Sequence, residues 1–118
     1  MISLGAATRV FLACGVTDMR KGYDGLYGLV KIQLEEDPLS GHLFVFANRQ
    51  RTRLKILYFD GTGLWICGKR LERGRFKWPV PDEPAQGKVR LSAAELAMLL
   101  GGIDLKGTKE RKWFRKNE

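Results

Sequence analysis

Residues 53–71 read Arg-Leu-Lys-Ile-Leu-Tyr-Phe-Asp-Gly-Thr-Gly-Leu-Trp-Ile-Cys-Gly-Lys-Arg-Leu, and this stretch decides the fold. Two runs rich in branched and aromatic side chains flank Asp60-Gly61-Thr62-Gly63, and such runs favour β-strands. Asp-Gly between them is a strong hairpin signal, because both residues tolerate the positive φ of tight hairpin turns. The Phe- and Val-rich run from His42 to Ala47 precedes the stretch, so we expect an antiparallel meander of three strands.

Further strands are expected on either side of the meander. Thr8 to Cys14 is a short β-rich run ended by Gly15, typical of a buried first strand. Residues 79–87 hold three prolines and form an extended linker, since proline cannot donate to a ladder. Lys88 to Leu91 follows the linker as a candidate short strand.

A long N-terminal helix is expected between the first two strands. Thr17 or Asp18 can cap its start, and Asp37-Pro38 sets its end. Apolar residues recur at steps of three and four, as on a core-facing stripe, at Tyr23, Leu26, Tyr27, Val30 and Leu34. Gly22, Gly25 and Gly28 lie on the same helix at a cost of up to about 1 kcal/mol each. They indicate either close backbone packing or a helix that rearranges with a partner.

A short C-terminal helix begins at a capping box, with Ser92 at the N-cap and Glu95 three residues later. Its apolar face is formed by Leu96, Leu99, Leu100 and Ile103, and Gly101-Gly102 ends it. The expected fold is therefore α+β, an antiparallel sheet of about four or five strands covered by a long N-terminal and a short C-terminal helix. Residues 1–105 form this single domain, and residues 106–118 form a basic, flexible tail.

Charge is the main functional signal. The chain carries a net charge of +8, and between Asn48 and Pro79 only Asp60 and Glu72 oppose nine cations. Unopposed cations on a sheet repel one another, so their retention indicates an anionic partner, and a nucleic-acid backbone fits best. The predicted contacts are Arg49, Arg51, Arg53, Lys55, Lys69, Arg70, Arg73, Arg75 and Lys77.

The geometry of this basic segment has open alternatives. A hairpin loop of two or four residues places Arg70 across from Arg51 or Arg53, and opposed like charges on a ladder are destabilising. Arg49 and Arg51 either continue the strand or lie in the turn after Ala47. Phe76 and Trp78, next to these cations, either stack on bases or belong to the core.

An enzymatic site is not expected. The carboxylates show no metal-binding spacing, and the only histidine, His42, is predicted to be structural. Cys14 and Cys67 lie in apolar runs outside any CxxC motif, so we expect two buried reduced thiols and no metal or other cofactor. The chain shows neither a secretory signal nor an apolar run that would span a bilayer, so we expect a cytoplasmic protein that does not bind membranes.

Four blocks in order resemble one known family. They are Thr-Asp-Met-Arg-Lys-Gly-Tyr-Asp-Gly-Leu (17–26), Ser-Gly-His-Leu-Phe-Val-Phe (40–46), Leu-Lys-Ile-Leu-Tyr-Phe-Asp-Gly-Thr-Gly-Leu (54–64) and Lys-Arg-Leu-Glu-Arg-Gly-Arg-Phe-Lys-Trp-Pro (69–79). Together they are similar to the TnpB accessory proteins, or Orf-two-like proteins, of the insertion-sequence-sixty-six transposon family. The family motif in the first block comprises Asp18, Met19, Arg20, Lys21 and Gly22.

The resemblance implies a non-catalytic accessory factor for DNA transposition, encoded beside a transposase. Its expected partners are DNA, as transposon ends or a strand-transfer intermediate, together with the transposase and the other small protein of the element. One alternative is a protein-interaction module that docks on the transposase without binding DNA, through the glycine-rich helix face with Tyr23 and Tyr27. A second alternative is a metal-dependent nuclease. The sequence leaves the oligomeric state open.

Overall fold

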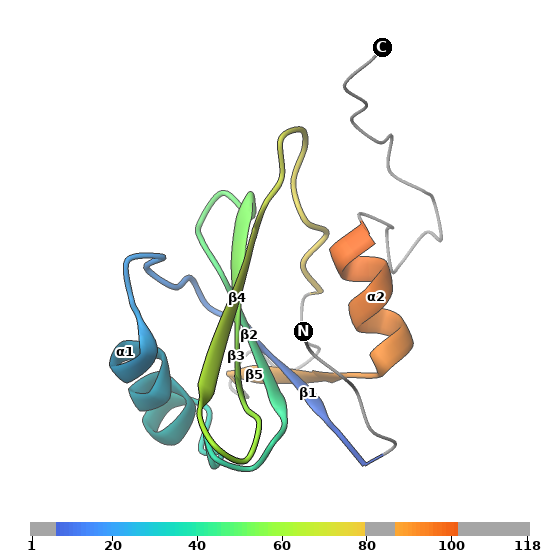
Figure 1. Cartoon of the computed structure of the whole chain (residues 1–118). Helices are drawn as coiled ribbons and strands as arrows, with labels where there is room; N and C mark the ends of the chain where they lie inside the picture. The colour runs from blue at the N-terminus through green and yellow to red at the C-terminus, as the bar shows by residue number, and fades with distance from the viewer. Residues whose placement is uncertain (1–6, 80–86, 102–118) are drawn as a thin grey trace.

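The computed structural model describes residues 7–79 and 87–101, which form a five-stranded sheet with a helical segment against each face (Figure 1). The strands run in the spatial order β4-β3-β2-β1-β5. Their bounds are Val10–Ala13 for β1, Leu43–Ala47 for β2, Arg53–Phe59 for β3, Leu64–Arg70 for β4 and Lys88–Leu91 for β5. The helical segments are α1 at Tyr23–Gly28, continued by the π-helical turn η1 at Leu29–Gln33, and α2 at Ala93–Gly101.

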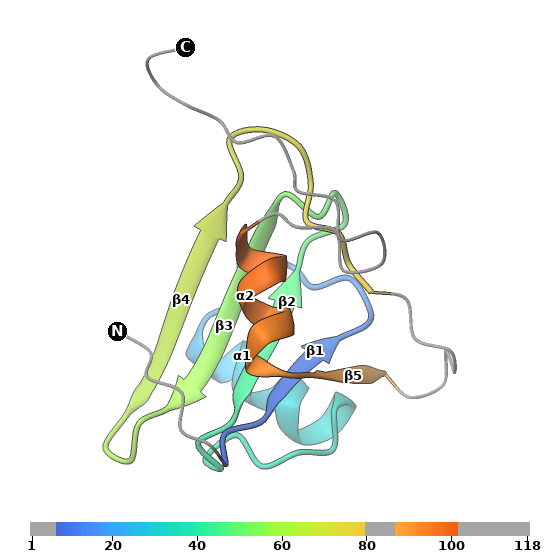
Figure 2. The same ribbon diagram turned by 90° about the vertical axis from the view of Figure 1, so that its right-hand side faces the viewer.

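The prediction of an antiparallel sheet is wrong, because the sheet is mixed. β1 pairs with β2 in parallel, with Phe11 opposite Phe44, while the other neighbouring pairs are antiparallel. The chain leaves the end of β1, passes through α1 and η1 across one face, and re-enters the sheet at the same end at which β1 began (Figure 2). A crossover connection of this kind joins parallel strands.

The prediction of a long N-terminal helix is also wrong. Neither Thr17 nor Asp18 caps it: the Asp18 carboxylate accepts the backbone N–H of Arg20, and the N–H of Thr17 donates to the carbonyl oxygen of Ala47. These bonds hold residues 17–21 as a loop, and only six α-helical and five π-helical residues follow. Glycine at every third position lowers helix propensity, which agrees with the short segment.

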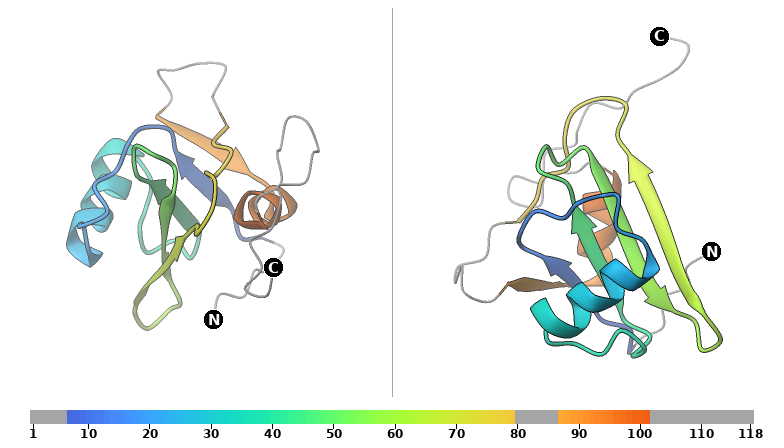
Figure 3. Two further views of the ribbon diagram at one scale, coloured as in Figure 1. Left: turned by 90° about the horizontal axis from the view of Figure 1, so that it is seen from above. Right: turned by 90° about the vertical axis from the view of Figure 1, so that its left-hand side faces the viewer.

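Two hydrophobic clusters pack on opposite faces of the sheet. The helical segments α1 and α2 lie over these two faces (Figure 3). One joins α1 and η1, through Leu26 and Val30, to Phe44 and Leu57. The other joins α2 to the opposite face, where its members include Val45, Leu54, Ile56, Leu96 and Leu99. Leu57 belongs to the first cluster and Leu54 and Ile56 to the second, because successive side chains of β3 point to opposite faces of the sheet.

The β3–β4 hairpin has the register with the four-residue loop, which pairs Phe59 with Leu64 and Arg53 with Arg70. Asp60 organises that loop: its carboxylate accepts the backbone N–H groups of Thr62 and Gly63 and the indole N–H of Trp65. These hydrogen bonds hold the pKa of Asp60 well below its usual range, and the bond from Trp65 contributes most to the shift.

The capping box of α2 is confirmed. The Ser92 hydroxyl accepts the N–H of Glu95 at 3.0 Å, and the Glu95 carboxylate accepts the N–H of Ser92 at 2.9 Å. Leu96 and Leu99 are buried as expected. Gly102, Ile103 and the basic tail at 106–118 lie outside the described residues.

Candidate nucleic-acid interface

The strand directions gather basic residues at one end of the sheet. β2 and β4 finish, and β3 begins, at the same end, as the arrowheads in Figure 2 show. We use the term cationic end for the residues at this end, which lie on β3, on β4 and in the adjoining loops: Arg49, Arg53, Arg70, Arg73 and Arg75. All five are exposed, so they are accessible to a ligand.

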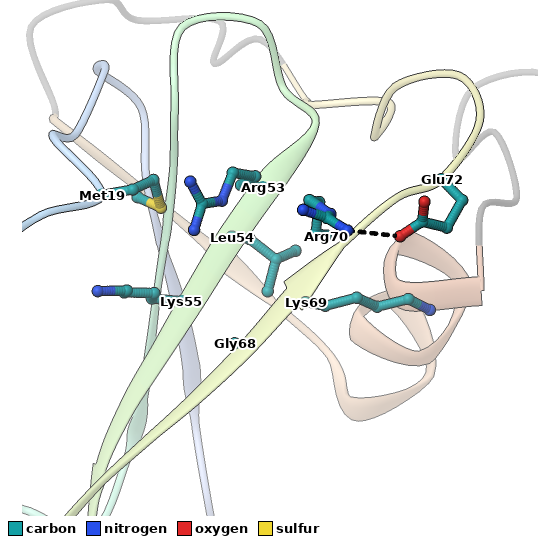
Figure 4. A pocket seen from close by; sticks show the side chains of 8 residues that line it. All are labelled: Met19, Arg53, Leu54, Lys55, Gly68, Lys69, Arg70 and Glu72. Atoms are coloured by element: carbon teal, nitrogen blue, oxygen red, sulfur yellow. Dashed lines mark hydrogen bonds and ion pairs between the residues drawn. The ribbon is translucent and has the colours of Figure 1, made fainter.

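A groove of about 400 Å³ opens across β3 and β4 beside the cationic end (Figure 4). Strand alternation and the hairpin register place Arg53, Lys55, Gly68 and Arg70 on the sheet face that α1 covers. The groove is lined by these four residues and by Met19, Leu54, Lys69 and Glu72.

Gly68 keeps this groove open. It pairs with Lys55 across the strands, and a Cβ built on it would approach only the carbonyl oxygen of Leu54, at 3.8 Å. A side chain at position 68 would therefore not clash with its neighbours, and close packing does not explain the glycine. Because no side chain stands at this position, space remains between Lys55 and Arg70. Sequence reasoning missed Gly68 as part of the site, although a glycine inside a strand is a known sign of close approach by a ligand or backbone.

The three groove cations on the α1 face of the sheet differ in their contacts. Lys55 donates its ammonium group to the carbonyl oxygen of Lys21 at 2.9 Å and so fixes the loop to the sheet. Arg70 forms an ion pair of 3.1 Å with Glu72, and the two side chains are 68% and 58% exposed. The Arg53 guanidinium has no hydrogen bond or ion pair with any residue in the described ranges. An exposed pair such as Arg70–Glu72 contributes only about 0–1 kcal/mol, so an incoming anion can replace it.

Arg51 faces the protein interior. It lies in the turn between β2 and β3 with a φ of 57°, and its guanidinium donates to the carbonyl oxygens of Cys14 and Gly15 at 3.2 and 3.3 Å. It also lies over the ring of Trp78, at 4.9 Å from the centroid. Of the two placements considered for Arg49 and Arg51, the turn is therefore the one found, and Arg51 joins the end of β1 to the segment after β4.

The aromatic residues beside the cations belong to the core. Phe76 is only 2% exposed. The indole of Trp78 donates to the carbonyl oxygen of Ala13 at 3.0 Å, and Arg51 covers its ring. Neither ring is available to stack on a base in this arrangement.

The remaining predicted cations lie in two places. Lys69 lines the groove, but its side chain lies on the α2 face of the sheet, opposite Arg53, Lys55 and Arg70, and donates its ammonium group to the carbonyl oxygen of Leu100 at 2.7 Å, at the end of α2. Arg73, Arg75 and Lys77 lie on the connection after β4, exposed to solvent, where Gly74 turns the chain with a φ of 75°. The nine predicted contacts therefore do not form one row along a strand.

The family-motif residues line the edge of the groove. Met19 is a groove wall, and Lys21 supplies the carbonyl oxygen that holds Lys55. Asp18 accepts three side-chain hydrogen bonds and one backbone hydrogen bond from Arg20, and the side-chain bonds are the main cause that lowers its pKa to about 2. Arg20 is thus neutralised locally, while Lys21 and Arg53 add positive charge without a paired carboxylate among the described residues.

Other candidate chemistry has structural explanations. His42 accepts the backbone N–H of Arg9 through Nδ1, and its ring packs edge-on against Phe11. Cys14 and Cys67 are free thiols and half-buried, less enclosed than expected, and burial raises the pKa of Cys14. Within residues 7–79 and 87–101, no three His, Cys, Asp or Glu side chains converge as a metal site requires. In that same part of the chain, no helix has the length and apolarity to cross a membrane.

Comparison with protein families places these features in a known group. The family model described as IS66 Orf2 like protein, TnpB_IS66, matches residues 8–110. That range includes β1 to β5, the groove and the motif loop.

Two curated relatives from Sinorhizobium fredii cover nearly the whole chain. Uncharacterized protein y4hO is 42% identical over 110 residues, which is 93% of this chain and 93% of the relative. Uncharacterized protein y4jC is 33% identical over 111 residues, or 94% of this chain and 92% of the relative. No solved structure matches this chain.

Proposed function

The chain belongs to the IS66 Orf2-like family, which is associated with transposition, and from this premise we propose that it is a non-catalytic accessory factor that binds transposon DNA. The proposed contact surface is the groove together with the cationic end. There the protein would help to position the element's transposase on the DNA. Family membership supports the transposition setting, and the geometry of the basic residues supports DNA as the ligand.

The observation that carries this proposal is the pairing of Arg53 with Arg70. The two residues lie directly opposite on one sheet face, and like charges in such a pair are destabilising. Only Glu72 offsets them within the groove. A phosphate between the two guanidinium groups would remove the repulsion and would accept bidentate hydrogen bonds, for which arginine is well suited.

The arrangement favours contact with the sugar–phosphate backbone. Phe76 and Trp78 are engaged inside the protein, so the basic surface offers guanidinium and ammonium donors rather than aromatic faces. Contacts of this kind fix a protein's position on DNA and carry little sequence information. We accordingly propose Arg49, Arg53, Arg70, Arg73, Arg75 and Lys77 as contacts, and we omit Arg51, Lys55 and Lys69, whose charged groups bind protein carbonyls.

The test is a DNA-binding titration across a salt series with the double variant Arg53→Gln/Arg70→Gln. Each phosphate contact contributes about 0.9 to the slope of log affinity against log salt, so the variant should reduce the magnitude of this slope by about two. We expect a loss of affinity on the order of tenfold at low salt.

The matched control is Arg9→Gln/Arg90→Gln, which removes the same charge from exposed positions outside the groove. If the two double variants lose affinity equally, binding depends on net charge and the groove is not the site. If neither variant changes the salt dependence, DNA is not the ligand of this surface.

Docking on the transposase without DNA is the second candidate. It is favoured by Tyr23, which is 53% exposed on α1, and by Gly28, where a built Cβ meets nothing within 4 Å. A pull-down with the transposase, repeated after nuclease treatment, separates the two functions. A complex that survives the nuclease supports direct docking, and one that is lost supports a DNA bridge.

A further inference from the structure

The outer edge of β4 carries backbone groups that have no partner among residues 7–79 and 87–101. Leu71 donates its N–H to the carbonyl oxygen of Thr52, and Asp60 donates to that of Gly63, so these two pairs are hydrogen-bonded. Along an antiparallel ladder, hydrogen-bonded pairs alternate with pairs that are not hydrogen-bonded. Trp65, Cys67 and Lys69 are therefore the β4 residues whose backbone groups bond to β3. The N–H and carbonyl groups of every other β4 residue therefore point away from the sheet, at Leu64, Ile66, Gly68 and Arg70.

No described element covers this edge. β4 is the last strand of the sheet order, and Figures 2 and 3 show both α1 and α2 on the faces of the sheet, not beyond β4. Trp65 on this strand is 46% exposed. A seven-residue edge strand with open hydrogen-bonding groups is a template for a further strand.

We propose that a second copy of this chain occupies the edge, with the two β4 strands paired antiparallel about a two-fold axis at Cys67. Full overlap of two seven-residue strands requires Leu64 opposite Arg70 and Ile66 opposite Gly68 of the second copy. This register also places the outward-pointing residues in hydrogen-bonded pairs. Strand length thus selects this register, and the hydrogen-bond parity of the outer edge is compatible with it.

The charges on the strand fit this pairing. Both cations lie in the C-terminal half of β4, so the antiparallel arrangement sets Lys69 beside Trp65 and Arg70 beside Leu64 of the second copy. No cation faces a cation across the new interface. The stem of Lys69 would cover part of the exposed indole, and the absent side chain of Gly68 leaves room for Ile66.

The pairing extends the proposed DNA surface. A two-fold axis perpendicular to the sheet keeps the α1 faces of both copies on one side, so the two grooves lie side by side across the junction. This step rests on the proposed function, whereas the pairing itself does not. The dimer should therefore be tested in the absence of DNA.

The first experiment measures the mass of the full chain by analytical ultracentrifugation over a concentration series, followed by oxidative cross-linking. Opposed residues of a non-hydrogen-bonded pair have Cα atoms about 4.5 Å apart, which is within disulfide range. We expect a concentration-dependent dimer, and a Cys14→Ser variant should cross-link through Cys67. Cys67→Ser, which retains Cys14, should stay uncross-linked. A monomer at every concentration, or cross-linking through Cys14 alone, would overturn the pairing.

The second experiment compares proline variants on the two edges. Gly68→Pro removes an outward N–H without removing a bond to β3, and proline is tolerated at such edge positions. Arg90→Pro is the control on β5, the other edge strand. The N–H of Cys14 donates to the carbonyl oxygen of Gly87, and alternation from this bonded pair places the N–H of Arg90 on the outer edge. Only Gly68→Pro should abolish the dimer. Equal dimerisation of both variants contradicts a β4 interface, and the Cys67 cross-link decides the question if either variant fails to fold.

Discussion

Arg51 and Arg53 are two positions apart in sequence, and their side chains have different environments. The positive φ of Arg51 turns its guanidinium towards the carbonyl oxygens of Cys14 and Gly15 and the ring of Trp78. Arg53 has regular strand geometry and faces the open groove. One arginine therefore stabilises the fold, and the other is available to a ligand.

Replacing Arg51 by methionine should lower the free energy of unfolding by about 1–3 kcal/mol, because two carbonyls lose a charged donor and Trp78 loses its cation. Lysine should not restore the loss, since its ammonium group lacks the planar fork that reaches both carbonyls. Urea denaturation measures the change. Arg49→Met in the same turn is the control and should stay within about 0.5 kcal/mol of wild type.

The Asp18–Arg20 contact predicts a response to acid. The pKa of Asp18 is lowered from 3.8 to about 2. Its bond to Arg20 therefore contributes its full stabilisation at pH values above the unfolded-state pKa of 3.8. That contribution is lost as the pH falls through about 2. An NMR titration of the Asp18 carboxyl should show the low midpoint, and Arg20→Gln should return it towards 3.8. An unchanged midpoint in the variant would exclude Arg20 as the cause.

At the scale of single elements, the α1–η1 segment departs most from its sequence expectation. Its apolar spacing correctly identified Leu26, Val30 and Leu34 as buried, but it was wrong for Tyr23, which is 53% exposed. Its start was not predictable, because the side chain of Asp18 bonds within a loop rather than at a helix N-terminus. That choice depends on the anchoring of the loop to β2 and β3 by Thr17 and Lys55, which are contacts distant in sequence.

Gly28 gives a testable consequence for this helix. A built Cβ there meets nothing within 4 Å, and Gly28 has helical φ and ψ of −61° and −40°. Gly28→Ala should therefore stabilise the protein by about 0.5–1 kcal/mol, as judged by chemical denaturation. Gly61→Ala is the contrasting variant and should destabilise, since Gly61 has a φ of 101°. Stabilisation by Gly28→Ala with weaker transposase binding would assign the glycine to a protein contact.

At the scale of the whole molecule, one sheet supports two separate hydrophobic clusters. Leu26 lies in the cluster under α1 and Leu99 in the cluster under α2, and both are fully buried. The two clusters share the strands between them, so the faces should unfold together rather than in succession.

Leu26→Ala and Leu99→Ala should each lower the free energy of unfolding by about 2–5 kcal/mol, because each deletes a buried side chain from a packed cluster. Fluorescence and circular dichroism should give coincident transitions in both variants. Ala97, exposed on α2, offers a control: Ala97→Ser should have an effect below about 0.5 kcal/mol. Separate transitions in either leucine variant would contradict cooperative unfolding of the two faces.

The sequence by itself determined the local features of this protein. Asp60-Gly61 specified the hairpin, the Ser92 and Glu95 pair specified the start of α2, and alternation along β3 separated its two faces. Each of these depends on neighbouring residues, whose conformational preferences and hydrogen-bonding groups can be read directly. The cationic segment could be recognised in the same way, by composition.

Only the tertiary structure decided the direction of β1, the length of the first helix and the roles of individual cations. The parallel pairing of β1 with β2 depends on where the crossover returns the chain. Arg51 and Lys69 bind carbonyls that lie 36–37 and 31 residues away in sequence, whereas Arg53 and Arg70 meet at the groove that Gly68 leaves open. Charge can be counted along the chain, but its availability to a ligand depends on which distant backbone groups the fold brings within hydrogen-bonding distance.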